Sequence, residues 1–447
     1  MSALIRYFLS LGKRVAGYDR TPSHLTRQLE DEGARLHYEE NPSLIPDDCR
    51  DPQSTLVVYT PAVPSAHAEL TWFAANGFEL CKRAQVLGLI PCHSKGLCVA
   101  GTHGKTTTTT MTAHLLRQSH VDCTAFLGGI SQNYGTNLLL SADSPYVVIE
   151  ADEFDRSFHW LRPWASVVTA TDPDHLDIYG TYEAYLDSFR HYTELVQPGG
   201  SLIVHTGLAL HPAPQPGVRL YSYGRDEGDF HAANVRVADG EIRFDFVSPW
   251  GVVPDVQLGV PVSVNVENGV AALALASLAG LTPEEMRRGM ASFRGVERRF
   301  DFKLRTPRHV LLSDYAHHPA EIARCLESLR ELYPSRRLTV LFQPHLYSRT
   351  RDLYHEFAQA LSLADEVVLT DIYPARELPI EGVSSRLIYD NLRPGAERVL
   401  CPRADVLRWL SAHPVDVLAV LGAGDIDNLV PDMHRLLAAV EEREGRP

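Results

Sequence analysis

A lysine and a run of hydroxyl side chains stand directly behind a glycine-rich turn near residue 100. Residues 97–100 are apolar, and the segment 101–107 reads Gly-Thr-His-Gly-Lys-Thr-Thr. A strand, a glycine turn and a helix in this order aim backbone N–H groups at an anion, and Lys105 would neutralise terminal phosphates. The usual phosphate loop has a further glycine where this chain has Val99. We therefore predict a shortened phosphate loop; the simpler alternative is a Gly/Thr-rich turn with an exposed lysine.

A cluster of acids follows the next predicted strand, at 146–149. Glu150 opens a stretch with four acids in six residues, 150–155. Carboxylates at the end of a strand, some 40 residues beyond a phosphate loop, suit Mg²⁺ coordination opposite a nucleotide. We predict Glu150 as the ligand and the other acids as supporting or surface residues. The alternative is a solvated acidic turn.

A histidine lies in an acid-rich loop after the strand predicted at 165–170. His175 can ligate a metal through a neutral ring nitrogen, and Asp174 or Asp177 can orient it. A structural histidine is the alternative, and the residue types alone do not decide between the two.

The first residues of the chain predict an amphipathic helix. Apolar side chains in 1–13 follow helical spacing, and no small-residue cleavage site follows, which argues against a signal peptide. A short strand at 14–19 then ends in Asp19. An acid at the end of a strand is typical of dinucleotide-binding folds.

Two polar residues flank the next strand-to-helix turn. We predict a strand at 56–60 and a helix at 66–76, with Thr60 and His67 between them. Because open α/β sheets bind ligands at the carboxyl ends of their strands, both residues are candidate ligand contacts. The alternative is that each is an ordinary turn or cap residue.

The middle of the chain carries weaker signals. Residues 199–229 are rich in Gly and Pro and predict few strands, 235–246 alternate as a hairpin, and 269–279 predict a helix of small residues. Asn265 and Asn268 stand one turn apart where that helix begins. An amide can read an adenine edge, but an asparagine at a helix start is also a common cap.

A further α/β unit begins after a junction at 295–301, in which Arg298 or Arg299 could reach a phosphate. Its predicted strands are 310–312, 338–342, 366–369 and 417–421. Polar or glycine-rich residues follow each of them, in the segments 314–319, 343–351, 371–377 and 422–425. This repetition predicts one shared ligand edge.

Composition limits the classes of function. A length of 447 residues corresponds to about three domains. The net charge of −14 argues against nucleic acid as a partner, and no apolar stretch reaches membrane-spanning length. Seven dispersed cysteines without a CxxC pair predict free thiols in a reducing cytoplasm.

These motifs together resemble the Mur ligase family, in its alanine-adding branch. The segments that carry the resemblance, in family order over nearly the whole chain, are 101–107, 150–153, 174–175, 298–300, 314–319 and 343–350. The resemblance implies an α/β fold of three domains. These are a Rossmann-like UDP-sugar domain at 1–95, a central P-loop ATPase-type domain at 96–299 and a Rossmann-like amino-acid domain at 300–447.

The resemblance also implies a reaction. ATP phosphorylates the lactyl carboxylate of UDP-N-acetylmuramate, and the amine of L-alanine attacks the acyl phosphate to give an amide, ADP and phosphate. No protein partner is implied. The implied catalytic residues are Lys105, Glu150, His175, His317 and Arg349, with Mg²⁺ held by Thr106, Glu150 and His175. The implied ATP contacts are Gly101, Thr102, His103, Gly104, Lys105, Thr106, Thr107, Asn268, Arg299 and Asp314. The implied substrate contacts are Ser2, Asp19, Thr60, His67, Tyr315, His317 and Arg349.

Three departures from the family pattern stand out. The family opens with a strand and a glycine-rich loop before the residues that match Met1-Ser2-Ala3, so we expect a misassigned start or a shortened protein. An arginine of the family motif at 343–349 is Leu346 here. No lysine lies between Lys105 and Lys303. This stretch therefore cannot supply the carbamylated lysine that several sister ligases use as a metal ligand.

Three other functions remain open. A recycling ligase would attach a ready-made tripeptide to the same sugar nucleotide. A nucleotide-binding remnant would bind ATP without turning over the sugar. A plain phosphotransferase would have no use for Tyr315, His317 and Arg349.

Overall fold

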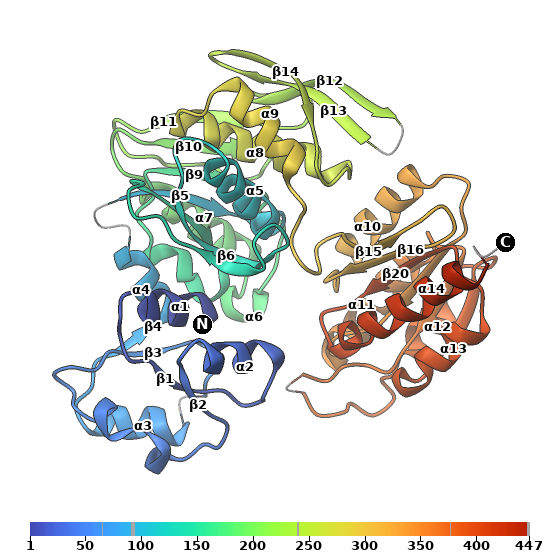
Figure 1. Cartoon of the computed structure of the whole chain (residues 1–447), viewed down its shortest axis with the longest axis horizontal. Helices are drawn as coiled ribbons and strands as arrows, with labels where there is room; N and C mark the ends of the chain where they lie inside the picture. The colour runs from blue at the N-terminus through green and yellow to red at the C-terminus, as the bar shows by residue number, and fades with distance from the viewer. Residues whose placement is uncertain (65, 91–93, 239–240, 376, 445–447) are drawn as a thin grey trace. The chain divides into compact units, whose positions relative to one another are not determined.

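The computed structural model describes the chain except residues 65, 91–93, 239–240, 376 and 445–447. It divides into two compact units, the first formed by 1–259 with 265–294 and the second by 260–264 with 295–447 (Figure 1). Six cysteines that it describes are free thiols, whereas Cys92 lies outside the described residues. None of the described helices is long and apolar enough to cross a membrane.

The first unit is built on a seven-stranded sheet of order β11-β10-β9-β5-β8-β6-β7. Only β7 runs antiparallel to its neighbour. The strands are β5 (Lys95–Ala100), β6 (Thr124–Ser131), β7 (Thr136–Leu139), β8 (Tyr146–Ala151), β9 (Ala165–Val168), β10 (Ser201–His205) and β11 (Arg219–Tyr223). The apolar end of β5, residues 97–100, is fully buried between β8 and β9, as expected of a central parallel strand.

Smaller elements complete this unit. Two parallel strand pairs, β1 (Ala16–Tyr18) with β2 (Arg35–His37) and β3 (Val57–Tyr59) with β4 (Leu80–Lys82), form its N-terminal part. An antiparallel sheet of β12 (His231–Ala238), β13 (Glu241–Ser248) and β14 (Gly251–Gln257) contacts α9 through β14 (Figure 1). The helices are α1 (Ser2–Ser10), α2 (His24–Asp31), α3 (Ala68–Ala75), α4 (Arg83–Leu89), α5 (Lys105–Arg117), α6 (Leu176–Tyr179), α7 (Tyr182–Glu194), α8 (Val264–Ala279) and α9 (Pro283–Ser292).

The second unit contains a six-stranded sheet of order β15-β16-β20-β17-β18-β19, parallel except for β15. The strands are β15 (Asp301–Arg305), β16 (Val310–Asp314), β17 (Leu338–Phe342), β18 (Glu366–Leu369), β19 (Glu397–Leu400) and β20 (Val417–Leu421). The helices are α10 (Pro319–Leu332), α11 (Tyr347–Leu361), α12 (Arg386–Asn391), α13 (Val406–Ala412) and α14 (Val430–Glu444). Because β20 pairs with β16 and β17, the carboxyl ends of these three strands lie side by side.

The structure confirms some of the elements predicted from the sequence and contradicts others. The strands expected at 338–342, 366–369 and 417–421 are confirmed residue for residue as β17, β18 and β20. The expectation of few strands in 199–229 is wrong, because β10 and β11 extend the main sheet there. The edge strand β11 begins with exposed residues and so lacks a continuous apolar run. The hairpin expected at 235–246 is part of a three-stranded sheet.

Candidate active site

Two glycines make the turn between β5 and α5. Gly101 has φ of +135°, and a Cβ atom there would lie 2.1 Å from Thr169 Oγ1. Gly104 has φ of +79°, and its Cβ would lie 2.7 Å from Asn268 Oδ1. Both positions therefore require glycine on grounds of backbone conformation and of space. The turn lies where the sheet order reverses around β5, the usual ligand position of open α/β sheets.

Hydrogen bonds attach this turn to the end of β9. The Thr102 amide donates to Ala170 O over 2.9 Å, and Thr102 Oγ1 donates to Asp172 O over 2.9 Å. Thr169 Oγ1 lies 2.5 Å from His103 O. The loop at 101–104 thus has a fixed shape set by the neighbouring strand.

Lys105 is the first residue of α5 and makes a buried ion pair that the sequence analysis did not foresee. Its Nζ lies 2.7 Å from Gly101 O and 2.8 Å from the carboxylate of Glu153, whose side chain is 1% exposed. Burial raises the pKa of Glu153 to about 7, although Lys105 acts in the opposite direction. Burial also lowers the pKa of Lys105, but the carboxylates of Glu153 and Glu150 outweigh it and keep the ammonium charged.

Two of the predicted metal ligands are neighbours. Thr106 Oγ1 donates to Glu150 Oε1 over 3.2 Å. Gly128 leaves room for this carboxylate, because a Cβ atom there would lie 2.1 Å from Glu150 Oε2. A hydroxyl and a carboxylate are hard oxygen donors, and Mg²⁺ completes such a set with water and substrate phosphates. The residues present fit Mg²⁺.

The third predicted ligand, His175, lies beside a different acid. Its Nε2 is 3.9 Å from Glu153 Oε1 and 3.7 Å from Asp174 Oδ2, and Phe154 packs edge-on against its ring. Among the described residues, no three His, Cys, Asp or Glu side chains form a group that could hold a metal by themselves. Any metal here would need hydroxyl, water or phosphate oxygens as well.

Asn268 packs against the first turn of α5. Its Oδ1 accepts a hydrogen bond of 3.3 Å from Thr108 Oγ1, and its Nδ2 donates to Asn265 Oδ1 over 3.2 Å. Thr107 lies on the same turn and is half-buried. Asn268 is therefore close to the phosphate loop, within the first unit.

The predicted sugar-nucleotide contacts all lie within the first 67 residues, in the first unit. His67 is buried, and its ring lies 4.6 Å from that of Tyr18, the residue before Asp19. Thr60 begins the turn after β3, where its carbonyl accepts from Val63 N. Ser2 is on α1, where its Oγ accepts a hydrogen bond from Asn137 Nδ2 of β7 over 2.9 Å.

In the second unit, Asp314 is the last residue of β16, and its carboxylate holds the backbone of the junction at 295–301. Its carboxylate accepts hydrogen bonds of 2.6 Å from Phe300 N and 2.7 Å from Ala316 N. Burial raises the pKa of Asp314 to about 6, although Arg299 acts to lower it. Arg299 also lies over the ring of Tyr315, with its Cζ 5.3 Å from the ring centroid.

The remaining predicted residues follow β16 and β17. The His317 ring lies 5.2 Å from Tyr315 and 5.8 Å from His345, and burial lowers its pKa, so it is neutral at pH 7. Arg349 is in the first turn of α11, and its buried Nη1 has no hydrogen-bond partner in the described part of the chain. Buried polar groups are normally paired, so this nitrogen is a strong candidate to receive a carboxylate.

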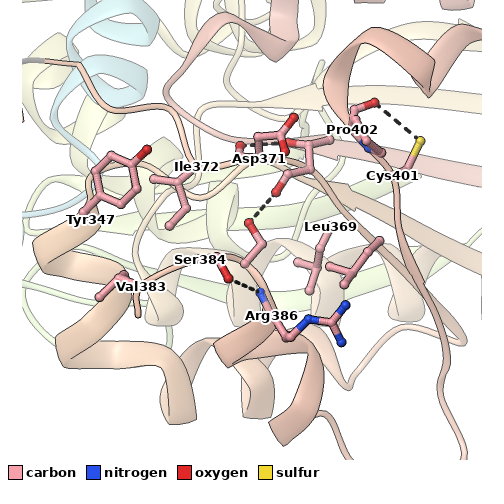
Figure 2. A pocket seen from close by; sticks show the side chains of 12 residues that line it. Tyr347, Leu369, Asp371, Ile372, Val383, Ser384, Arg386, Cys401 and Pro402 are labelled. Carbon is pink, nitrogen blue, oxygen red and sulfur yellow. Dashed lines mark hydrogen bonds between the residues drawn. The ribbon is translucent and has the colours of Figure 1, made fainter. Parts of the chain in front are cut away.

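A cavity of about 300 Å³ opens at the carboxyl ends of β18 and β19. Figure 2 shows Tyr347, Asp371, Ser384, Arg386 and Cys401 around it. None of the residues predicted individually as site residues lines this cavity, but Tyr347 and Asp371 belong to the segments 343–351 and 371–377 of the predicted ligand edge.

A glycine turn at a sheet switch point, with a lysine and neighbouring hydroxyl and carboxylate oxygens, is typical of nucleotide-dependent α/β enzymes. The family models agree along the chain: the Mur ligase family catalytic domain matches residues 1–94, the Mur ligase middle domain 99–276, and the Mur ligase glutamate ligase domain 298–424. The chain belongs to the Mur ligase family.

Relatives and solved structures agree with this assignment. The chain is 67% identical to the UDP-N-acetylmuramate–L-alanine ligase of Phocaeicola vulgatus, over 98% of this chain and 95% of that protein. It is 57% identical to that of Parabacteroides distasonis, over 98% and 95%. The crystal structure of the Thermotoga maritima UDP-N-acetylmuramate-alanine ligase matches 99% of this chain and 97% of that one, with a TM-score of 0.82 and 26% identity. A murein peptide ligase from Psychrobacter arcticus, with a TM-score of 0.67, 20% identity and coverage of 98% and 96%, shares the fold.

Proposed function

We propose that this protein is an ATP-dependent ligase that joins L-alanine to the lactyl carboxylate of UDP-N-acetylmuramate, a step in making peptidoglycan precursors. The observation that carries the proposal is the 67% identity, over nearly the whole chain, to a relative named for this activity. The tripeptide-ligase alternative is represented by structural neighbours of 20% and 23% identity, and likeness at that level speaks for the fold alone.

The reaction has two transfers. The lactyl carboxylate attacks the γ-phosphorus of ATP, the bond to the bridging oxygen breaks, and ADP leaves. The amine of alanine then attacks the acyl phosphate carbon, inorganic phosphate leaves, and the nitrogen loses a proton. A carboxylate approaching a polyanion needs concentrated positive charge, and Lys105 supplies it in the first unit. The glycine turn contributes its backbone N–H groups to the same task.

The second unit offers groups suited to the amino acid. The unpaired Nη1 of Arg349 can bind the alanine carboxylate, and the neutral ring of His317 can accept a proton from the ammonium group. Arg299 and Asp314 are proposed as nucleotide contacts from this unit, and Asn268 as the adenine contact from the first. Ser2, Asp19, Thr60 and His67 stay proposed contacts of the sugar nucleotide.

Mg²⁺ is the proposed metal. Thr106 and Glu150 would hold it, with His175 as a further candidate ligand, and it would neutralise phosphate charge when bound. We also propose three domains at 1–95, 96–299 and 300–447, and a cytoplasmic location, which the described free cysteines support.

An assay that compares two amine substrates in separate reactions tests the function. Purified protein with ATP, Mg²⁺ and UDP-N-acetylmuramate is offered either L-alanine or the tripeptide L-alanyl-γ-D-glutamyl-meso-diaminopimelate, and phosphate release and product mass are measured. We expect turnover with alanine and little with the tripeptide. Turnover with the tripeptide alone would assign the recycling reaction, and ATP binding without either product would indicate a remnant.

A further inference from the structure

A single carboxylate connects the loop after β18 to the first turn of α11. Glu377 accepts a hydrogen bond of 2.9 Å from the Ser348 amide, and its other oxygen accepts a short one from Ser348 Oγ. These donors lie at the N-terminus of α11, where backbone N–H groups lack partners within the helix and negative charge is favourable. Glu377 therefore acts as a helix cap supplied by a segment 29 residues further along the chain.

The turn before α11 needs such outside support. Leu346 adopts φ of +72°, a backbone region that residues with a Cβ atom rarely occupy and that is strained unless the surroundings hold it. The loop after β18 holds this turn, since Leu346 N donates to Tyr373 O over 3.0 Å and Tyr373 N to Pro344 O over 2.8 Å. Glu377 extends the same attachment into the first turn of the helix, at Ser348.

Arg349 depends on this arrangement. It follows Ser348 directly, in the first turn of α11, and its buried Nη1 has no hydrogen-bond partner in the described structure. No bond to that nitrogen fixes where it points. The direction of the guanidinium group therefore depends on where the helix begins.

We propose that Glu377 is a positioning residue that sets the first turn of α11, so that Arg349 meets the carboxylate of the incoming amino acid. This inference rests on the proposed ligase function. Burial raises the pKa of Glu377, but the bonds from Ser348 outweigh this effect and hold it below its usual value. The cap therefore remains ionised at the neutral pH of an assay.

Steady-state kinetics of Glu377→Ala test the proposal, with Glu381→Ala as the matched control because Glu381 is an exposed acid of the same loop. We expect KM for L-alanine to rise about tenfold or more in Glu377→Ala, because small displacements of a binding group are costly. The KM values for ATP and UDP-N-acetylmuramate and the value of kcat should stay within about threefold. The control should match the wild type.

A double-mutant cycle separates positioning from general stability. If Glu377 acts through Arg349, Glu377→Ala should add less than about twofold to KM for alanine in an Arg349→Ala background. An equal effect in both backgrounds, or a fall in kcat alone, would overturn the proposal. If Glu377→Ala does not fold, Glu377→Gln, which keeps the volume but loses the charge, carries the same test, and an unchanged KM for alanine refutes the proposal.

The two proposals fail in different ways. A wild-type protein without alanine-dependent phosphate release would refute the ligase function itself. An active wild type with unchanged alanine KM in the Glu377 variants would refute only the positioning role.

Discussion

The phosphate-loop lysine is paired with a carboxylate that is almost fully buried. Lys105 Nζ lies 2.8 Å from Glu153 Oε1, and the Glu153 side chain is 1% exposed. Removing one member of a buried pair leaves the other uncompensated, which costs several kcal/mol unless the remaining group changes protonation. Glu153 can do so, because its pKa is already about 7.

Replacing Lys105 should therefore abolish catalysis without unfolding the protein. We expect Lys105→Ala to lose at least about 10³-fold in kcat, because the variant lacks the positive charge that we propose faces the phosphates of ATP. Glu153 will be protonated at pH 7, and raising the pH towards 9 should destabilise this variant more than the wild type. Phosphate release and denaturant unfolding at pH 6, 7 and 9 measure both effects. Retained ligase activity would refute the nucleotide assignment.

The proposed magnesium ligand Glu150 depends on a glycine opposite it. In Gly128→Ala the new methyl would lie 2.1 Å from Glu150 Oε2, so the carboxylate must leave the position in which it accepts the hydrogen bond from Thr106. We expect the Mg²⁺ concentration for half-maximal activity to rise about tenfold. Gly96→Ala is the control, because its methyl would meet its nearest atom at an ordinary 3.7 Å. A magnesium titration that is identical in wild type and Gly128→Ala would remove Glu150 from the proposed metal site.

At the scale of elements, α9 is held at its start by a reciprocal cap. Glu285 accepts hydrogen bonds of 2.9 Å from Thr282 N and of 2.9 Å from His120 N, which joins the helix to the turn that follows α5. Burial raises the pKa of Glu285, but these amide bonds outweigh it and lower the pKa to about 2. The folded state thus favours the ionised carboxylate more than the unfolded chain does.

The sign of the pH dependence follows from that shift. The stabilisation by Glu285 is fully present above its unfolded pKa of 4.5 and is lost as the pH falls from there towards 2. We expect Glu285→Gln to lower the free energy of unfolding by about 1 kcal/mol at pH 7 and by less at pH 4. Urea unfolding of this variant and of Glu284→Gln, whose side chain is 71% exposed, makes the comparison. The capping argument would be contradicted if the difference in unfolding free energy between the wild type and Glu285→Gln increased as the pH is lowered.

At the scale of the whole molecule, each unit has a hydrophobic core and a mostly parallel sheet of its own. Most of the proposed nucleotide contacts, Lys105 and the glycine turn among them, lie in the first unit, whereas Arg299, Asp314 and Arg349 lie in the second. Ligands that bind only the folded state of a unit stabilise that unit by mass action.

ATP alone should therefore protect the first unit. At a hundred times Kd we expect about 2.7 kcal/mol of added protection for the amides of β5 and α5. Hydrogen exchange of these segments, compared with β17 and β20, measures it, and Lys105→Ala is the negative control. Protection confined to β17 and β20 would show that ATP binds the second unit, and would contradict the proposed phosphate site at Lys105.

The sequence by itself determined the features that local pattern encodes. The order of apolar strand, glycine turn and lysine is enough to predict the loop at 101–107, because backbone conformation and residue spacing are local properties. The strands β17, β18 and β20 were predictable because each is a short, buried apolar run between polar turns. The family follows from the same motifs.

Only the tertiary structure decided which carboxylate of the acidic run pairs with Lys105. Glu150 and Glu153 are three residues apart in one acidic run, and no spacing rule shows that the second is the partner of Lys105. The Glu377–Ser348 cap and the insertion of β20 between β16 and β17 join segments far apart in the chain. Edge strands such as β11 escape the pattern because one-sided pairing does not require a continuous apolar run. These contacts depend on chain topology, which the local sequence does not encode.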